Sequence, residues 1–294
     1  MKTLTVFTPT YNRAHTLTRT YQSLCAQTCK DFEWLIIDDG STDNTAILAN
    51  QWILDSDFKV RYIYKENGGL HTGYNTAIEN INSELCVCID SDDYMPNDAV
   101  EKIITFWDNN RSDDVAGILG LDFMINGKPI GGYFKDGIYK LKMSELAPKY
   151  KHYGDVKVVH RTSLLKEVAP MPTFDNEKNF NPIYLFYKID MKYPLLLLND
   201  NICFVEYQPD GMTNNIFYQY INSPKSFSEL RRLIMSRPDV CLSFKFRQAI
   251  HYVSSQIMIK NKNWLNDSPQ KFLTLLAAPL GGLLYIYIKY KTKK

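Results

Sequence analysis

The chain has little net charge, no internal repeat and no cysteine pattern of a metal site. Its 34 Lys and Arg nearly balance 32 Asp and Glu, leaving a net charge of +2 over 294 residues. That balance excludes the strongly basic surface of a nucleic-acid-binding protein, so we expect no nucleic-acid partner. None of the six cysteines forms a C-x-x-C pair, and Cys25 and Cys29 lack nearby histidines, which disfavours a zinc site. Reduced thiols in a cytosolic protein are the preferred interpretation.

The first residues lack a basic stretch followed by a long apolar run, so we expect no signal peptide. Beyond them, short apolar runs alternate with stretches of helical periodicity. We expect strands at residues 4–8, 34–37, 60–64, 85–89 and 115–121, and helices at residues 14–27, 42–54, 72–81 and 99–107. This alternation predicts an α/β fold, with a mostly parallel Rossmann-like sheet and helices on both faces.

Ligands of such sheets bind outside the carboxyl ends of the strands, so the residues that follow each strand are the candidate functional ones. These segments are residues 8–13, 38–41, 65–69 and 90–93. All four are polar and rich in turn-forming residues, and two of them carry adjacent acids. The sequence therefore predicts a polar site at one edge of the sheet.

Three acids crowd into the last of these segments, at Asp90, Asp92 and Asp93. Neighbouring carboxylates raise one another's pKa values and cost stability when nothing compensates them. Mg²⁺ or Mn²⁺ would resolve that conflict, because it takes one or two carboxylates and completes its shell with substrate phosphate oxygens. The alternative is a solvated acidic turn.

Asp38 and Asp39 end a neighbouring strand and could accept hydrogen bonds from a ribose hydroxyl or a base N–H. The alternative is that they cap the helix expected at residues 42–54, a task that Ser41 and Asp43 would share. Tyr11 could stack on a base or could simply pack. The remaining donor-side candidates of this edge are Arg13, Arg61, Gly68, Gly69, His71 and Asn75.

The motifs Thr8-Pro9-Thr10-Tyr11-Asn12-Arg13, Ile37-Asp38-Asp39-Gly40-Ser41-Thr42-Asp43, Asn67-Gly68-Gly69 and Ile89-Asp90-Ser91-Asp92-Asp93 resemble those of the family 2 inverting glycosyltransferases, which have the GT-A fold. The resemblance covers residues 1–120 and implies a nucleoside-diphosphate-sugar donor, commonly a UDP-sugar. It implies that Asp92 is the direct ligand of Mn²⁺ or Mg²⁺, with Asp90 nearer the ribose and also a metal candidate. It also implies that Thr8, Tyr11 and Asp39 hold the base and ribose. With the candidates named above, the predicted donor-binding residues are Thr8, Tyr11, Arg13, Asp38, Asp39, Arg61, Asn67, Gly69, His71, Asn75, Asp90, Ser91 and Asp93.

The pattern of strands and helices loosens beyond about residue 122, and we expect three segments: a nucleotide-sugar-binding lobe at 1–120, a mixed acceptor lobe at 121–225 and a helical region at 226–294. Inversion needs a carboxylate that takes the acceptor hydroxyl proton. No Glu-Asp pair follows at the usual distance, and the candidates are Glu177, which we favour, with Asp175 and Asp155. The alternative for Glu177 is a surface acid paired with Lys178. The segment Asp210-Gly211-Met212-Thr213 is expected to form a turn that closes over the donor.

Residues 272–288 are almost uncharged but contain Pro279, Gly281 and Gly282, and lysines follow them. We expect a helical pair or a re-entrant hairpin at the inner face of the cell membrane, with residues 272–294 against anionic lipid. A buried packing helix or a dimer contact is the alternative. The predicted function is sugar transfer to a saccharide or lipid-linked acceptor in bacterial surface polysaccharide synthesis. A sugar nucleotidyltransferase and a non-catalytic nucleotide-sugar-binding protein stay open, although the loop after the first strand lacks the glycine-rich, basic character of the former.

Overall fold

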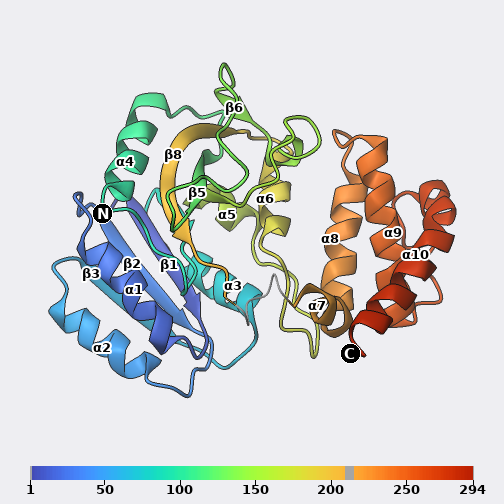
Figure 1. Cartoon of the computed structure of the whole chain (residues 1–294), viewed down its shortest axis with the longest axis horizontal. Helices are drawn as coiled ribbons and strands as arrows, with labels where there is room; N and C mark the ends of the chain where they lie inside the picture. The colour runs from blue at the N-terminus through green and yellow to red at the C-terminus, as the bar shows by residue number, and fades with distance from the viewer. Residues whose placement is uncertain (1, 209–214, 294) are drawn as a thin grey trace. The chain divides into compact units, whose positions relative to one another are not determined.

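A computed structural model of the chain describes residues 2–208 and 215–293 (Figure 1). These residues form an eight-stranded sheet in the order β3-β2-β1-β4-β7-β5-β8-β6. The strands are β1 (Leu4–Thr10), β2 (Phe32–Asp38), β3 (Lys59–Tyr64), β4 (Leu85–Cys88), β5 (Gly117–Met124), β6 (Lys140–Leu141), β7 (Val156–Arg161) and β8 (Leu195–Val205). Strands β6 and β7 run antiparallel to their neighbours, and the others run parallel to one another. The predicted mostly parallel sheet is confirmed.

Helices surround this sheet and continue beyond it along the chain. They are α1 (Ala14–Cys25), α2 (Thr45–Asp55), α3 (Leu70–Asn80), α4 (Ala99–Asn110), α5 (Thr162–Val168), α6 (Ile183–Asp190), α7 (Ile216–Asn222), α8 (Pro224–Ser236), α9 (Leu242–Ile259) and α10 (Lys271–Lys291), with a 3-10 turn η1 (Met143–Glu145).

Alternating residues of the strands face two layers of helices, as the pleat of a strand requires. On one face, β-strand residues such as Val6 and Trp34 join a core built with α1, α2 and α4. On the other face, Phe7 meets Tyr74 of α3 edge to face at 5.1 Å. Both faces are therefore covered, which explains why strands such as β1 and β2 are buried along their whole length.

The start of α2 differs from the prediction. We expected the helix to span residues 42–54, with Ser41 and Asp43 among its capping residues, but it begins at Thr45. The carboxylate of Asp43 accepts hydrogen bonds from the backbone N–H and the hydroxyl of Thr45, at 3.0 and 2.6 Å. The Ser41 hydroxyl instead accepts a hydrogen bond from the loop that follows β1, as described below.

The chain divides into two compact units, one made of Met1–Pro170 and Lys188–Glu206, the other of Met171–Tyr187 and Tyr207–Lys294. Within the first unit, β7 inserts between β4 and β5, so the strands beyond residue 120 extend the first sheet. The expected boundary between the nucleotide-sugar-binding lobe and the acceptor lobe, at residue 120, falls inside β5. The assignment of separate functions to the three segments stays a prediction.

In the second unit, α10 packs on α9, where Gly281 allows close approach: a Cβ at this position would lie 2.5 Å from the side chain of Val253. The prediction of a break near Pro279 is wrong, because a single helix runs from Lys271 to Lys291 with Pro279 inside it. Among the described residues, α10 is long and apolar enough to cross a membrane, judged by length and composition alone.

Candidate active site

The loops that follow β1 and β2 are joined by direct hydrogen bonds. Asn12 has a positive φ of 53°, and its backbone N–H donates to the hydroxyl of Ser41 at 2.9 Å. The Asn12 side-chain oxygen accepts from the backbone N–H of Thr42 at 2.8 Å. Tyr11 stands beside this junction with 49% of its surface exposed, so its ring is available to a ligand at this edge of the sheet.

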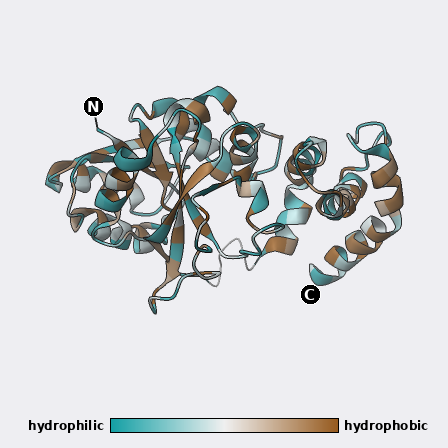
Figure 2. Ribbon diagram, turned by 90° about the horizontal axis from the view of Figure 1, so that it is seen from above, coloured by the Kyte–Doolittle hydropathy of each residue, from teal (hydrophilic) through white to brown (hydrophobic). Residues whose placement is uncertain are grey.

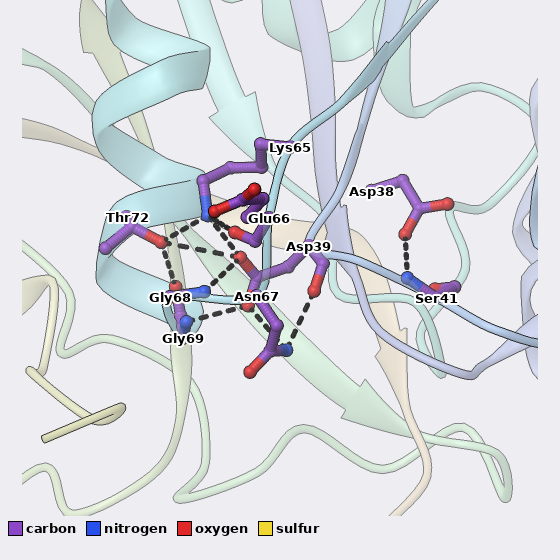
Figure 3. A network of polar contacts seen from close by, with 9 residues as sticks. All are labelled: Asp38, Asp39, Ser41, Lys65, Glu66, Asn67, Gly68, Gly69 and Thr72. Atoms are coloured by element: carbon purple, nitrogen blue, oxygen red, sulfur yellow. Dashed lines mark hydrogen bonds and ion pairs between the residues drawn. The ribbon is translucent and has the colours of Figure 1, made fainter. Parts of the chain in front are cut away.

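Asp39 is the centre of a network that shapes the loop after β3 (Figure 3). Its buried carboxylate accepts hydrogen bonds from the backbone N–H groups of Gly68 and Gly69, at 3.0 and 2.7 Å, and forms an ion pair with Lys65. Asn67 donates to the Asp39 backbone carbonyl at 2.7 Å. A carboxylate with so many donors is held in place, so Asp39 fixes the conformation of residues 67–69.

Gly40 and Gly69 are required by the conformation of these loops. Gly40 has a φ of 85°, and a Cβ there would lie 2.9 Å from the backbone nitrogen of Asn67. Gly69 has a φ of 95° and directly precedes α3. The first turn of α3 carries His71, which is buried, and Asn75 follows one turn later and is half-buried. The structure thus brings these predicted residues to the edge that Asp38 and Asp39 occupy.

The turn after β4 holds the acids that the sequence singled out. The backbone N–H of Asp93 donates to the carbonyl of Asp90 at 3.0 Å, which closes the turn around Ser91 and Asp92. Asp90 is exposed, Asp92 is half-buried and Asp93 is buried. Burial, and then the nearby charge of Asp90, raise the pKa of Asp92, while Arg13 acts in the opposite direction.

A buried lysine lies beneath this turn. Lys157 of β7 donates to Asp93 at 3.2 Å and lies 3.8 Å from Asp122 of β5. Burial raises the pKa of Asp93 to about 6 and that of Asp122 to about 7, against the opposing effect of Lys157. Burial alone would lower the pKa of Lys157, but Asp122 and Asp93 among its neighbours raise it well above its usual value. The ammonium group of Lys157 therefore stays charged and offsets only part of the negative charge of the surrounding carboxylates.

Asp155 lies at the same edge of the sheet. It directly precedes β7, which pairs antiparallel with β4 through Val87 and Val159, so the start of β7 lies beside the end of β4. Its side chain is exposed, and its charge contributes to the raised pKa of Asp122. Asp155 is thus the predicted base candidate that belongs to the same compact unit as the acidic turn.

Glu206 and Arg19 complete this edge from β8 and α1. Glu206 follows the end of β8 and forms an ion pair with Arg19. The same guanidinium donates to the backbone carbonyl of Asp92 and lies 4.9 Å from the ring centroid of Tyr94. Arg19 therefore holds the acidic turn by its backbone and leaves the Asp92 carboxylate available.

Two predicted donor residues serve other parts of the fold. Arg61 donates to Glu33 at 3.2 Å and to the carbonyl of Asn80 at 2.9 Å, at the far end of α3, so the structure does not bring it to the donor edge. Thr8 is fully buried, and its hydroxyl accepts a hydrogen bond from the indole of Trp34 at 3.0 Å. Its side chain therefore faces the core.

Glu177, our favoured base, is occupied at a helix terminus of the second unit. Its carboxylate oxygens accept hydrogen bonds from the backbone N–H groups of Lys225 and Ser226, both at 2.8 Å, and from the Ser226 hydroxyl at 2.7 Å. A carboxylate at the N-terminus of a helix stabilises that helix, here α8. The base prediction for Glu177 is therefore corrected to a structural role. Asp175 is exposed in the same unit, and the segment Asp210–Thr213 lies outside the described residues.

The sequence analysis did not identify four charged residues of this edge, which are Lys157, Asp122, Lys65 and Arg19. Lys157 and Asp122 each interrupt an apolar run, Val156-Lys157-Val158-Val159 and Leu121-Asp122-Phe123, and a charged residue inside a buried strand is a signal in the sequence. Lys65 directly follows β3 and is one of the strand-end positions. Arg19 carries no such signal, because it lies within a helix and reaches the site only through the packing of α1.

The fold is an α/β fold with polar loops and an acidic turn at the carboxyl ends of its parallel strands, and comparison with known proteins identifies the family. Residues 5–168 match the family model described as glycosyl transferase family 2, so the chain belongs to this family. Some curated bacterial glycosyltransferases align over only 108 or 100 residues, at 36% and 33% identity, and this chain spans just 18% and 14% of their length.

Other similarities extend over nearly the whole chain. The poly(ribitol-phosphate) beta-N-acetylglucosaminyltransferase TarP of Staphylococcus aureus is 23% identical, covering 91% of this chain and 87% of that protein. The structure of S. aureus TarS residues 1–349 in complex with UDP-GlcNAc superimposes with a TM-score of 0.64 at 19% identity, covering 94% of this chain and 79% of that one. The mannosyltransferase PcManGT of Pyrobaculum calidifontis, in complex with GDP-Man and Mn²⁺, gives a TM-score of 0.59 at 17% identity, covering 96% and 73%. These structures share the fold of this chain, which is the GT-A fold.

Proposed function

We propose that the chain transfers a sugar with inversion from a nucleoside-diphosphate sugar, most simply a UDP-sugar, to a saccharide or lipid-linked acceptor in bacterial surface polysaccharide synthesis. The observation that carries the proposal is the excess of carboxylates around Asp90 and Asp92, which Lys157 and Arg13 offset only in part. A diphosphate with its cation supplies the charge that such a site lacks. The solved structures with bound nucleotide sugars share this fold and support the donor class.

The donor-side roles follow from exposure and from the hydrogen bonds. Tyr11, exposed beside the junction of two loops, stacks on the base. Asp39 acts through the loop that it holds, since Gly68 and Gly69 can then approach the donor closely. Arg13, whose charge acts on Asp92, answers the diphosphate.

The residues of the acidic turn fit a hard divalent cation. No group of three or more His, Cys, Asp or Glu side chains that could hold a metal is present among the described residues, so the protein offers fewer ligands than a closed structural site. Mg²⁺ and Mn²⁺ suit that arrangement, because they bind through one or two carboxylates and substrate phosphates. Asp92 and Asp90 would hold the ion, which when bound neutralises charge on the leaving nucleotide.

Asp155 is our candidate for the general base, in place of Glu177. Its exposed carboxylate lies at the edge where the acidic turn ends β4. In that role it takes the acceptor hydroxyl proton as the oxygen attacks the anomeric carbon. Lys157, two residues along β7, partly neutralises the neighbouring acids Asp93 and Asp122.

A donor screen tests the proposal. With Mn²⁺ present, we expect a UDP-sugar to raise the melting temperature more than GDP- or dTDP-sugars, since a ligand at about 100 times its Kd adds about 2.7 kcal/mol of stability. We also expect slow release of UDP, which a coupled assay measures. A sugar nucleotidyltransferase would instead consume a nucleoside triphosphate and a sugar phosphate. Specific donor binding with neither hydrolysis nor transfer would identify a non-catalytic protein.

We further propose that α10 holds the enzyme at the inner face of the cell membrane. One side of α10 packs within the second unit through residues such as Ala277 and Gly281. Apolar residues colour much of this helix, which ends at the C label in Figure 2, and those on its opposite side are exposed. The exposed side chains are Phe272, Leu275, Leu276, Leu280, Leu283, Ile286, Tyr287 and Tyr290. Lys289 and Lys291 lie in the last turn of α10 and Lys293 follows it, where these side chains complement anionic headgroups.

We expect the protein to sediment with phosphatidylglycerol vesicles more than with phosphatidylcholine vesicles, and less in about 1 M salt, where charges are screened beyond about 3 Å. The double substitution Leu276→Ser and Leu283→Ser should lower the partition coefficient about tenfold or more, because each leucine removed loses apolar burial. Leu54→Ser, at an exposed leucine of α2, is the matched control. A concentration-dependent dimer without vesicle binding would assign the exposed side of α10 to a second copy of the chain instead.

A further inference from the structure

A small cavity of about 180 Å³ lies in the first unit, between the segment 131–152 and Leu197 of β8. Three aromatic side chains line it, those of Tyr133, Phe134 and Tyr150, together with the two lysines Lys135 and Lys151. No Asp or Glu is among the described residues that line it. The cavity is smaller than the usual pocket of a drug-sized ligand, so it admits one sugar ring.

One wall of the cavity holds a histidine whose polar atom is unsatisfied. His152 is 7% exposed, its ring lies 5.2 Å from that of Phe134, and its buried Nε2 atom has no hydrogen-bond partner in the described structure. An unmade bond at a buried polar atom costs about 1–3 kcal/mol. Burial lowers the pKa of His152, so the ring is neutral at neutral pH and suits a hydroxyl group.

Gly131 keeps this wall open. It has a φ of +80°, and a Cβ there would lie 3.2 Å from the His152 Nε2 atom and 2.4 Å from the backbone nitrogen of Gly154. Gly154 directly precedes Asp155, so the wall of the cavity continues into the edge where we place the general base. A group bound in the cavity is therefore next to the acceptor side of the reaction.

The two lysines give the cavity a positive charge. Lys135 forms no ion pair within the part of the chain that the structure describes, and Lys151 donates only to the backbone carbonyl of Pro148, at 3.0 Å. Neither ammonium group is neutralised by an acid of the cavity wall. A hydrogen bond to a charged group contributes about 1.5–3 kcal/mol, more than a bond between neutral groups.

We propose that this cavity binds one ring of the acceptor saccharide and selects a ring that carries an anionic substituent, either a carboxylate or a phosphate. The aromatic side chains contact the apolar face of the sugar, and Lys135 and Lys151 bind the anion. His152 bonds a ring hydroxyl once its ring turns toward the cavity, because its Nε2 atom is covered by protein in this structure. The inference rests on the proposed glycosyltransferase function, because it names the acceptor class of that same reaction.

The test measures binding of three sugars to the full chain by saturation-transfer NMR and titration, in the absence of donor. They are methyl glucoside, methyl glucuronide and methyl glucoside 6-phosphate. We expect both charged sugars to bind about tenfold more tightly than the neutral one, which corresponds to about 1.4 kcal/mol. Preference for the glucuronide identifies a uronic acid, and preference for the phosphate a sugar phosphate.

The double substitution Lys135→Gln and Lys151→Gln should remove the preference for charge, and His152→Phe should weaken all three sugars by conserving the ring but losing the bond. Lys128→Gln, at an exposed lysine outside the cavity, is the matched control. Equal affinity for the three sugars, or an unchanged preference in the double variant, would overturn the proposal. Because these titrations contain no donor, an intact sugar preference together with no transfer in a separate assay with donor would count against the proposed function alone.

Discussion

Replacing Asp92 with asparagine is expected to lower the rate of sugar transfer by about 10²- to 10³-fold, or about 3–4 kcal/mol of transition-state stabilisation. The asparagine keeps the shape of the side chain but removes the negative charge that, in our proposal, binds the divalent cation. The turn itself should survive, because Arg19 and the Asp93 N–H hold it through backbone carbonyls. Initial rates at saturating donor, over a series of Mn²⁺ concentrations, measure the loss.

The same substitution should leave the metal-free protein as stable as the wild type or more so. Burial and Asp90 raise the pKa of Asp92 in the folded state, so its ionisation above that pKa costs stability, and asparagine avoids this cost. The difference should vanish as pH falls below the ordinary pKa of an aspartate, about 3.9. Asp113→Asn, at an exposed acid before β5, is the control. Full activity of Asp92→Asn in the presence of a chelator would rule out the metal role.

The order of strands and helices in the first 120 residues was predictable because each signal is local. Apolar runs such as Leu85–Cys88 are buried on both faces, and they are followed by turn-forming residues. The structure of the end of the chain was less predictable, because it depends on contacts between residues that are distant in the sequence. Pro279 suggested a break, but the packing of Gly281 on Val253 belongs to a continuous helix, and that contact is not visible in the sequence.

The site divides in the same way. Asp90 and Asp92 were found because a strand end is a local signal and parallel strands bring their ends together. The roles of Arg61 and Glu177 could not be read locally, since their partners Glu33 and Ser226 are 28 and 49 residues away along the chain. The guanidinium group of Arg61 and the carboxylate of Glu177 therefore stabilise the fold. Only their partners in three dimensions distinguish them from residues that bind the donor.

The substitution Asp155→Asn is expected to lower kcat by about 10²- to 10⁴-fold, the usual contribution of general acid–base catalysis. Asparagine cannot accept the acceptor hydroxyl proton, although it retains the size of the aspartate. Binding of the UDP-sugar with Mn²⁺, measured by calorimetry, should change little if Asp155 acts on the acceptor.

Glu177→Gln and Asp175→Asn separate this role from those of the other two candidates. The first should destabilise α8 by about 1–2 kcal/mol, because the Glu177 carboxylate caps that helix, and should leave kcat nearly unchanged in the folded protein. Asp175 is exposed, and its substitution should affect neither stability nor rate. If Asp155→Asn instead raises the donor Kd in parallel with the loss of kcat, Asp155 positions the donor sugar. If Asp175→Asn alone abolishes transfer while donor binding persists, the base comes from the second unit and the acidic edge of the sheet serves the donor only.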